Sequence, residues 1–269
     1  QNIDVASDGN VYNILLIGSD TRDGWYGNSD SMILASINSQ TKTIYMTSFM
    51  RDLYANIPNV GIRKLNSAYA IGGGPLLVST IESNYRVDID NYASVDFSSM
   101  ANIIDLVGGV DLEVSTQEAG YINMYLDEQC RLQGLNASDY YVAGGGITHL
   151  NGNQAVGFAR IRYTSRGNEH SDYGRTSRQR EILVQLMQKA RSLDATTLLA
   201  VVNNMLPLIT HNIDAATLTT LIANAPSYIN YDIQTDRIPY DGLYSNLGEE
   251  LVPDFEATIN RLHQTIYGN

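Results

Sequence analysis

Apolar runs near the start of the chain predict three strands. Residues 11–18 are apolar and partly β-branched, which is typical of a strand buried in a sheet. Residues 31–38 and 43–49 have the same character, and only the polar segment SQTK separates the second run from the third. A connection this short predicts that these two strands form an antiparallel hairpin.

Apolar positions spaced by three and four predict helices after these strands. The glycines at 72–74 predict a break between the first two helices, and Pro75 suits the first turn of the second. Residues 115–150 are less regular, with one helix through Cys130 and a glycine-rich loop. The remaining pattern predicts helices at 64–71, 75–87, 97–107, 151–161, 176–193, 195–206 and 214–225 and from 253 onward, and strands at 91–95, 110–114 and 231–238.

This alternation of strands and helices predicts an α/β fold. No internal repeat or low-complexity linker divides the chain, so we predict one domain over residues 1–269. A hydrophobic fraction of 43% and a charged fraction of 17% are typical of a folded globular protein. No apolar run reaches the roughly eighteen residues that a membrane helix needs. The chain begins without Met or a leader, so we expect an N-terminal anchor to precede Gln1 in a longer chain.

Charge and cysteine usage narrow the classes of function. A net charge of -12 and a pI near 4.6 argue against a nucleic-acid partner, which requires a basic face on the protein. Cys130 is the only cysteine, which excludes an internal disulfide and a cysteine-based metal cluster. The histidines lack zinc spacing, and the chain has neither a GxxxxGK phosphate loop nor a GxSxG elbow. We therefore expect a metal, carboxylates and guanidinium groups to carry any chemistry.

Against this acidic background, arginines concentrate between residues 159 and 180. The six in this segment are Arg160, Arg162, Arg166, Arg175, Arg178 and Arg180. A guanidinium group binds phosphate well because its planar fork donates two parallel hydrogen bonds. Arg175, Arg178 and Gln179 share one face of a helix near its N-terminus, where the helix dipole also favours an anion. The alternative is a solvated basic helix end with salt bridges to Glu169, Asp172 and Glu181, which stays open for Arg166 and Arg180. We leave these two arginines to the solvent.

Two aspartates and two cations stand at the predicted edge of the sheet. Asp20 and Asp30 lie at ends of core strands, a usual place for ligands, and two such carboxylates suit Mg²⁺ or Mn²⁺. The alternative is that each is a turn or cap residue. Arg51 follows the third strand as a candidate phosphate clamp, or pairs with Asp52. We predict that Lys64 opens a helix, where the helix dipole disfavours a cation. An unfavourable placement of this kind is typical of a functional site.

Six segments, in this order, carry a resemblance to a known family: NILLIGSDTR (13–22), SDSMILASINSQTKTIYMTSFMRD (29–52), KLNSAYAIGGG (64–74), VDFSSMANIIDLVGGVDLEV (95–114), HLNGNQAVGFARIRY (149–163) and DYGRTSRQREIL (172–183). The chain resembles the LytR-CpsA-Psr family of cell-envelope proteins. The core motifs of the family cover residues 12–193, with a variable insert near 115–147. Residues 194–269, with their predicted helices, strand and closing helix, resemble the family more weakly. The resemblance implies a central mixed β-sheet flanked by helices on both faces.

The resemblance also implies an activity. Family members are anchored outside the cytoplasmic membrane, face the cell wall, and transfer a glycopolymer such as teichoic acid or capsule polysaccharide. The donor is a polyprenyl-pyrophosphate-linked glycan, the acceptor is peptidoglycan, and polyprenyl phosphate is released. The lipid tail would lie between the sheet and the helices at 75–87 and 97–107, whose apolar faces are otherwise simply core.

Roles for particular residues follow from the same resemblance. Asp20 and Asp30 correspond to aspartates that bind Mg²⁺ or Mn²⁺. Many members carry Arg where this chain has Asn28, so either one phosphate-facing charge is missing or Arg22 supplies it from the loop. Pyrophosphate contacts of the family correspond to Arg51, Arg160, Arg162, Arg175 and Gln179, and Lys64 lies in a typical motif. With Arg22 from the loop and Arg178 from the helix face described above, these are the residues expected at the pyrophosphate. Those expected to act directly in catalysis are Asp30, Arg51, Arg160 and Arg175.

Two other functions stay open beside the transferase. A pyrophosphatase would use water in place of the sugar acceptor, and a non-catalytic protein would only bind lipid-linked glycans. Asp30 and Asp172 are the candidates for a general base. We predict that the arginine-rich segment forms one wall of a site whose other wall comes from Asp20, Asp30 and Arg51.

Overall fold

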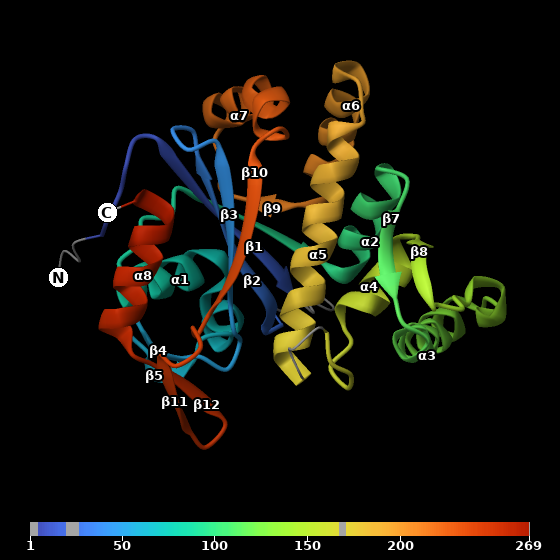
Figure 1. Ribbon diagram of the computed structural model, residues 1–269, viewed down its shortest axis with the longest axis horizontal. Coiled ribbons are helices and arrows are strands. Elements are labelled where there is room, and N and C mark those ends of the chain that lie inside the picture. Colours follow the sequence, from blue (N-terminus) through green and yellow to red (C-terminus); the bar gives the residue numbers. More distant parts are fainter. Residues whose placement is uncertain (1–4, 20–26, 167–170, 269) are drawn as a thin grey trace. The chain divides into compact units, whose positions relative to one another are not determined.

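The computed structural model describes residues 5–19, 27–166 and 171–268, and its contacts group into two compact units (Figure 1). Unit 1 consists of Gln1–Asp96 and Ile209–Asn269, and unit 2 of Phe97–Leu208. The expectation of one catalytic domain stays a prediction. Among the described residues, no helix combines the length and apolar character needed to cross a membrane.

Unit 1 is built on a six-stranded sheet with the strand order β10-β3-β2-β1-β6-β9. β1 and β3 pair antiparallel with β2, whereas β6 is parallel to β1 and β10 is parallel to β3. The α/β fold with a central mixed sheet is therefore confirmed, and so is the hairpin. The strands are β1 Val11–Ser19, β2 Ser29–Asn38, β3 Thr43–Phe49, β6 Asn91–Asp96, β9 Thr210–His211 and β10 Asp232–Ile238.

In the described part of unit 1, the helices are α1 Ser67–Tyr85, α7 Ala215–Tyr228 and α8 Phe255–Tyr267. α1 and α8 lie side by side, and both pack against β2 (Figure 1). The predicted glycine break is confirmed inside α1, where Gly72 and Gly73 have non-helical dihedrals. Gly73 has φ +63°, a conformation that glycine adopts without steric cost. The helix resumes after Gly73, with Pro75 in its first turn, and buries Leu77 and Ile81.

Two short antiparallel ribbons in unit 1 were not predicted. They are β4 Tyr54–Ile57 with β5 Gly61–Lys64, and β11 Tyr244–Leu247 with β12 Glu250–Pro253. The first ribbon turns at Asn59 and Gly61, which both have positive φ. Asn and Gly accept this conformation readily, and these turn residues were the sequence signal for the ribbon. The expectation that Lys64 opens a helix was wrong. Lys64 ends β5 and α1 begins at Ser67, so the dipole argument does not apply to it.

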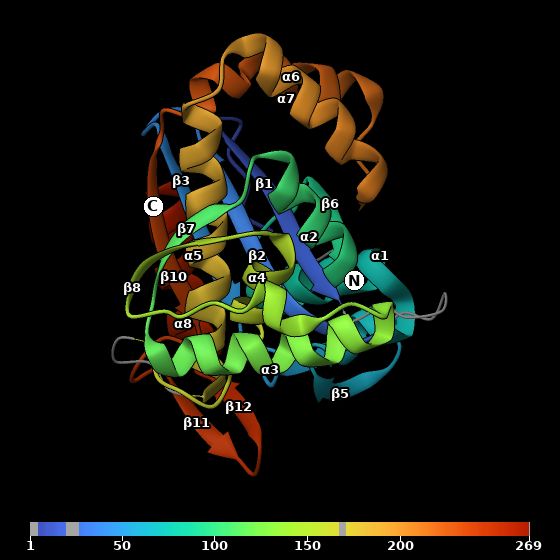
Figure 2. The ribbon, with the colours of Figure 1, turned by 90° about the vertical axis from the view of Figure 1, so that its right-hand side faces the viewer.

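Unit 2 is mainly helical. Its elements are α2 Phe97–Leu106, β7 Val110–Val114, α3 Thr116–Gln133, the 3₁₀ turn η1 Ala137–Tyr140, β8 Gly146–Leu150, α4 Gly152–Ala159, α5 Ser171–Arg191, α6 Ala195–Met205 and the 3₁₀ turn η2 Leu206–Leu208. β8, which was not predicted, pairs antiparallel with β7, and β7 runs beside α5 (Figure 2). The core of the unit includes Ile104, Ile122, Phe158 and Ile182.

Gly152, the first residue of α4, allows a close approach of α4 to α2. A Cβ atom at this position would lie 2.0 Å from the backbone oxygen of Ala101. We expect Gly152→Ala to lower the free energy of unfolding by about 1–3 kcal/mol, because backbone atoms cannot rotate away from the added methyl group. Urea unfolding monitored by circular dichroism measures the change.

Gly120→Ala is the matched control. Gly120 is exposed on α3, and an added Cβ atom would meet nothing within 4 Å. Alanine should raise stability there by about 0.5–1 kcal/mol, because it restricts the unfolded chain and favours the helix. Equal effects of the two substitutions would contradict the packing role of Gly152.

Candidate functional site

Strand register brings Asp30 and Arg51 together at one edge of the sheet in unit 1. β2 and β3 pair with Ile33 opposite Ser48, and continuing that register by three residues places Asp30 opposite Arg51. The Asp30 Oδ1 atom lies 3.6 Å from Arg51 Nη1, and the two side chains are 20% and 26% exposed. A carboxylate and a guanidinium are therefore held, partly shielded from water, on strand ends.

The ion pair continues into a row of alternating charges. Arg51 Nε lies 3.5 Å from Asp52 Oδ2, and Lys64 Nζ lies 3.0 Å from Asp52 Oδ1. Lys64 Nζ also donates to Glu249 Oε2 at 3.1 Å. Hydrogen bonds to Asp52, and then to Glu249, raise the pKa of Lys64. The structure thus groups Asp30, Arg51 and Lys64, three of the predicted site residues, on one ion-pair network.

Asp20 and Arg22 lie outside the described residues. Ser19, the residue before Asp20 in sequence, pairs with Ser29, the residue before Asp30. Among the residues that the structure describes, no group of three or more His, Cys, Asp or Glu side chains forms a metal site. Asp30 is thus the described member of the predicted metal pair.

In unit 2, Arg160 follows α4 and is held by aromatic rings. Its guanidinium carbon lies 4.8 Å from the ring centre of Phe97 and 5.0 Å from that of Tyr125. Gly157 leaves room for the second ring, because a Cβ atom there would lie 2.9 Å from Tyr125. Within the described part of the chain, the Arg160 guanidinium makes no hydrogen bond. Cation–π contacts orient this cation without engaging its N–H donors.

Asp172, in the first turn of α5, holds two more of the predicted arginines. Its Oδ1 atom lies 2.9 Å from Arg175 Nη2 and 3.7 Å from Arg162 Nε. Arg175 is buried, whereas the Arg162 side chain is 36% exposed. Gln179 lies one turn further along α5, and its buried Oε1 atom has no hydrogen-bond partner among the described residues. One carboxylate therefore orients two guanidinium groups.

Arg178 has a structural role instead of the predicted contact with pyrophosphate. Its side chain is fully buried, and Nε donates to Glu118 Oε1 at 2.9 Å. Nη1 donates to the Ile161 carbonyl at 3.2 Å, and Nη2 donates to the Thr164 and Ser165 carbonyls at 3.1 Å. Burial lowers the pKa of Arg178, and the hydrogen bond to Glu118 opposes this effect. The helical spacing is as predicted, but the Arg178 side chain points into the interior of unit 2.

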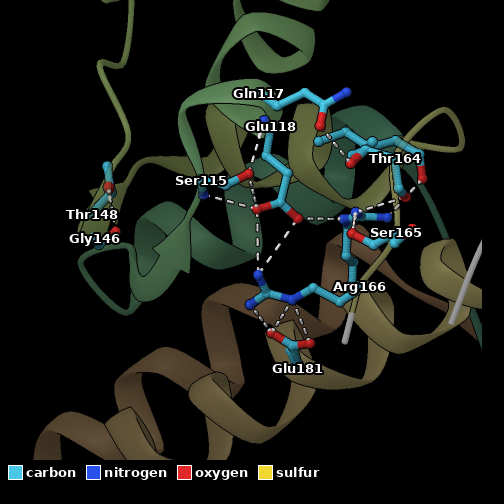
Figure 3. Close-up of polar contacts among 11 residues, drawn as sticks. Ser115, Gln117, Glu118, Gly146, Thr148, Thr164, Ser165, Arg166 and Glu181 are labelled. Atoms are coloured by element: carbon cyan, nitrogen blue, oxygen red, sulfur yellow. Dashed lines mark hydrogen bonds and ion pairs between the residues drawn. The ribbon is translucent and has the colours of Figure 1, made fainter. Parts of the chain in front are cut away.

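Arg166 and Arg180 are not left to the solvent as expected. Arg166 is 17% exposed and donates through Nε to Glu181 Oε1 at 2.9 Å. Its Nη1 atom lies 3.4 Å from Glu118 Oε2, so Arg166 lies between the two carboxylates (Figure 3). The hydrogen bond to Glu181 raises the pKa of Arg166. Arg180 is also buried.

Sequence reasoning missed Glu118, which lies in the variable insert. Its side chain also closes a capping box with Ser115 at the start of α3. The spacing S-x-x-E is a readable signal for that box. It does not reveal the ion pairs with Arg166 and Arg178, which come from residues 48 and 60 positions away.

A pocket of about 380 Å³ lies elsewhere in unit 1, around the first residues of β1. It contains none of the predicted site residues. Its lining includes Tyr12, Asn13, Asp88, Asp90 and Tyr228. The candidate site is consequently defined by its charged groups and not by this cavity.

Comparison with known proteins identifies the family. Residues 1–262 match the LytR_cpsA_psr family, and the chain belongs to it. A relative from Oceanobacillus iheyensis, named polyisoprenyl-teichoic acid–peptidoglycan teichoic acid transferase TagU, is 35% identical over 96% of this chain and 75% of its own. A relative of the same name from Enterococcus faecalis is 31% identical over 72% of this chain and 60% of its own.

Solved structures confirm the fold. The LytR-CPS2A-psr family protein YwtF (TagT) from Bacillus subtilis, solved with bound octaprenyl pyrophosphate lipid, is similar with a TM-score of 0.68 and 21% identity. The alignment covers 97% of this chain and 92% of that chain.

The arginines of unit 2 should separate into structural and functional groups on substitution. We expect Arg178→Ala to lower the free energy of unfolding by about 3–5 kcal/mol, because it leaves the buried Glu118 carboxylate without a main partner. Arg162→Ala removes a partly exposed ion pair and should cost no more than about 1 kcal/mol. Urea unfolding of both variants measures the difference, and equal losses would contradict this division.

Proposed function

We propose that this protein is a phosphotransferase that moves a glycopolymer from a polyprenyl-pyrophosphate carrier to peptidoglycan. Teichoic acid and capsule polysaccharide are the classes of glycopolymer proposed. The observation that carries the proposal is the 35% identity, over 96% of this chain, to a relative named as a teichoic acid transferase. The octaprenyl pyrophosphate bound to a protein of the same fold supports this class of donor.

The cations that each unit holds suit the charge changes of the same reaction. A sugar hydroxyl forms a new P–O bond to the glycan-linked phosphorus, and the P–O bond to the bridging oxygen breaks. Polyprenyl phosphate leaves with the electron pair, so negative charge builds up on the leaving phosphate. Arg51 in unit 1 and Arg160 and Arg175 in unit 2 are assigned to bind and neutralise phosphate oxygens. The hydroxyl proton passes to a carboxylate, for which the sequence predicts Asp30 or Asp172.

Asp30 fits a role in holding a divalent cation. It is a strand-end carboxylate, partly shielded from water, and the β1–β2 register brings Ser19 and Ser29 into a pair just before the two predicted ligands. Hard oxygen ligands of this type suit Mg²⁺ or Mn²⁺. When bound, the ion would supply further positive charge for the phosphate oxygens. Asp20 and Asp30 are the residues proposed to hold it.

The proposed location is outside the cytoplasmic membrane, facing the cell wall. A lipid-linked donor lies in the membrane and the peptidoglycan acceptor lies beyond it, so the enzyme must reach both. We propose an N-terminal membrane anchor for this purpose, as the resemblance implies.

Loss of either charged partner at the sheet edge should abolish transfer. We expect Arg51→Ala and Asp30→Asn to lower kcat/KM at least about 100-fold with a lipid-pyrophosphate-linked donor, since each removes a group that acts on developing charge. Arg63→Ala is the control, because Arg63 is an exposed arginine on β5. Release of polyprenyl phosphate and labelling of peptidoglycan are both measured. Full transfer by both site variants would overturn the assignment.

Metal removal tests the second part of the proposal. We expect EDTA to stop transfer and Mg²⁺ or Mn²⁺ to restore it. Without the cation, the two carboxylates would repel the negatively charged pyrophosphate. Transfer that survives complete chelation would exclude the metal.

The same assay separates the other two functions. Release of polyprenyl phosphate without peptidoglycan would indicate a pyrophosphatase, and tight donor binding without turnover would indicate a binding protein.

A further inference from the structure

We propose that Glu118 is a positioning residue for the segment 160–166, which carries Arg160 and Arg162, two of the arginines predicted to bind phosphate. The inference rests on the proposed function, because that function assigns phosphate to this segment. Glu118 lies outside the sequence segments that carry the family resemblance, in the insert near 115–147. It would act through other residues and would not touch the donor.

The Glu118 carboxylate is buried and bonded on both oxygen atoms. Oε1 accepts from Arg178 Nε at 2.9 Å. Oε2 accepts from the Ser115 backbone N–H and from Ser115 Oγ, both at 2.9 Å, and lies 3.4 Å from Arg166 Nη1. A single carboxylate thus joins the start of α3 to Arg166, which Figure 3 shows beside it, and to Arg178.

Arg178 passes this constraint to the backbone of the segment. With Nε held by Glu118, its two terminal nitrogens donate to the carbonyls of Ile161, Thr164 and Ser165. Because a guanidinium group is planar, fixing one nitrogen also fixes the directions of the other two. The three carbonyls flank Arg162 on both sides, so the position of its backbone depends on Glu118.

Charge balance makes the carboxylate hard to replace. Arg166 and Arg178 carry two positive charges, which Glu118 and Glu181 balance. Arg178 has no contact with solvent, so a partner without charge leaves a buried cation poorly compensated. Both arginines also lie over the ring of the buried Phe158. The guanidinium carbons of Arg166 and Arg178 lie 5.2 and 5.7 Å from the ring centre. A shift of Arg178 would therefore disturb α4 as well as the segment.

Glu118→Gln is the decisive variant, because it keeps the shape and removes the charge. The affinity for octaprenyl pyrophosphate is measured by titration calorimetry, and amide hydrogen exchange is followed over residues 161–166. We expect binding to weaken at least about tenfold and exchange in this segment to accelerate by a similar factor.

Two controls separate positioning from general stability. Glu128→Gln makes the same charge change at an exposed position on α3 and should alter neither measurement. Asp194→Ala removes the cap of α6, whose carboxylate accepts from the Thr196 and Thr197 amides. It should lower the melting temperature of the protein without changing donor affinity or exchange over residues 161–166.

The outcomes are distinguishable. Unchanged affinity together with unchanged exchange in Glu118→Gln would overturn the inference, and so would an equal loss of affinity in Asp194→Ala. If Glu118→Gln does not fold, Arg178→Lys keeps the charge but removes the fork, and it must accelerate exchange over residues 161–166. Failure of the wild-type protein to bind octaprenyl pyrophosphate would count against the proposed function, while hydrogen exchange would still decide the role of Glu118.

Discussion

A guanidinium group buried away from water needs hydrogen-bond acceptors around it, and this requirement shapes unit 2 around Arg178. The main-chain carbonyls after α4 turn toward Arg178, and Glu118 reaches it from the start of α3. The bend of the chain after α4 is thus a consequence of satisfying one side chain. Arg162 lies within that bend, so the position of its backbone follows from the same contacts.

The topology explains how a helical unit became part of a sheet protein. Unit 2 begins immediately after β6 and ends just before β9, and these two strands are antiparallel neighbours in the sheet. Chain ends that leave and return at adjacent strands lie close together, which is the condition under which a large insertion leaves its host intact. After the insertion the sheet continues with the short strand β9 at one edge, and β10 later completes the opposite edge.

Much of unit 1 could be predicted from the sequence, including one contact of the candidate site. The apolar runs indicated β1, β2 and β3, and the SQTK turn determines which residues face each other across the hairpin. Counting outward from that turn brings Asp30 opposite Arg51, as the structure places them. Glu118 could not be found in this way, because its partners lie on other elements and nothing local indicates burial of a charged cluster. Helical spacing correctly placed Arg178 in the first turns of α5 near Arg175 and Gln179. Spacing alone does not tell which side chains point into the core, so the burial of Arg178 could not be predicted.

Arg160 differs from the other arginines in how it is restrained, and this has a thermodynamic consequence. A free arginine loses about 2 kcal/mol of side-chain entropy when it is immobilised on a ligand. Phe97 and Tyr125 already confine its guanidinium group when unit 2 folds. A donor that binds this side chain would meet a preorganised cation, so less of its binding free energy is lost to ordering and more is left for the phosphate. If Arg160 binds the donor as proposed, the two aromatic rings would contribute to affinity by holding the cation in place.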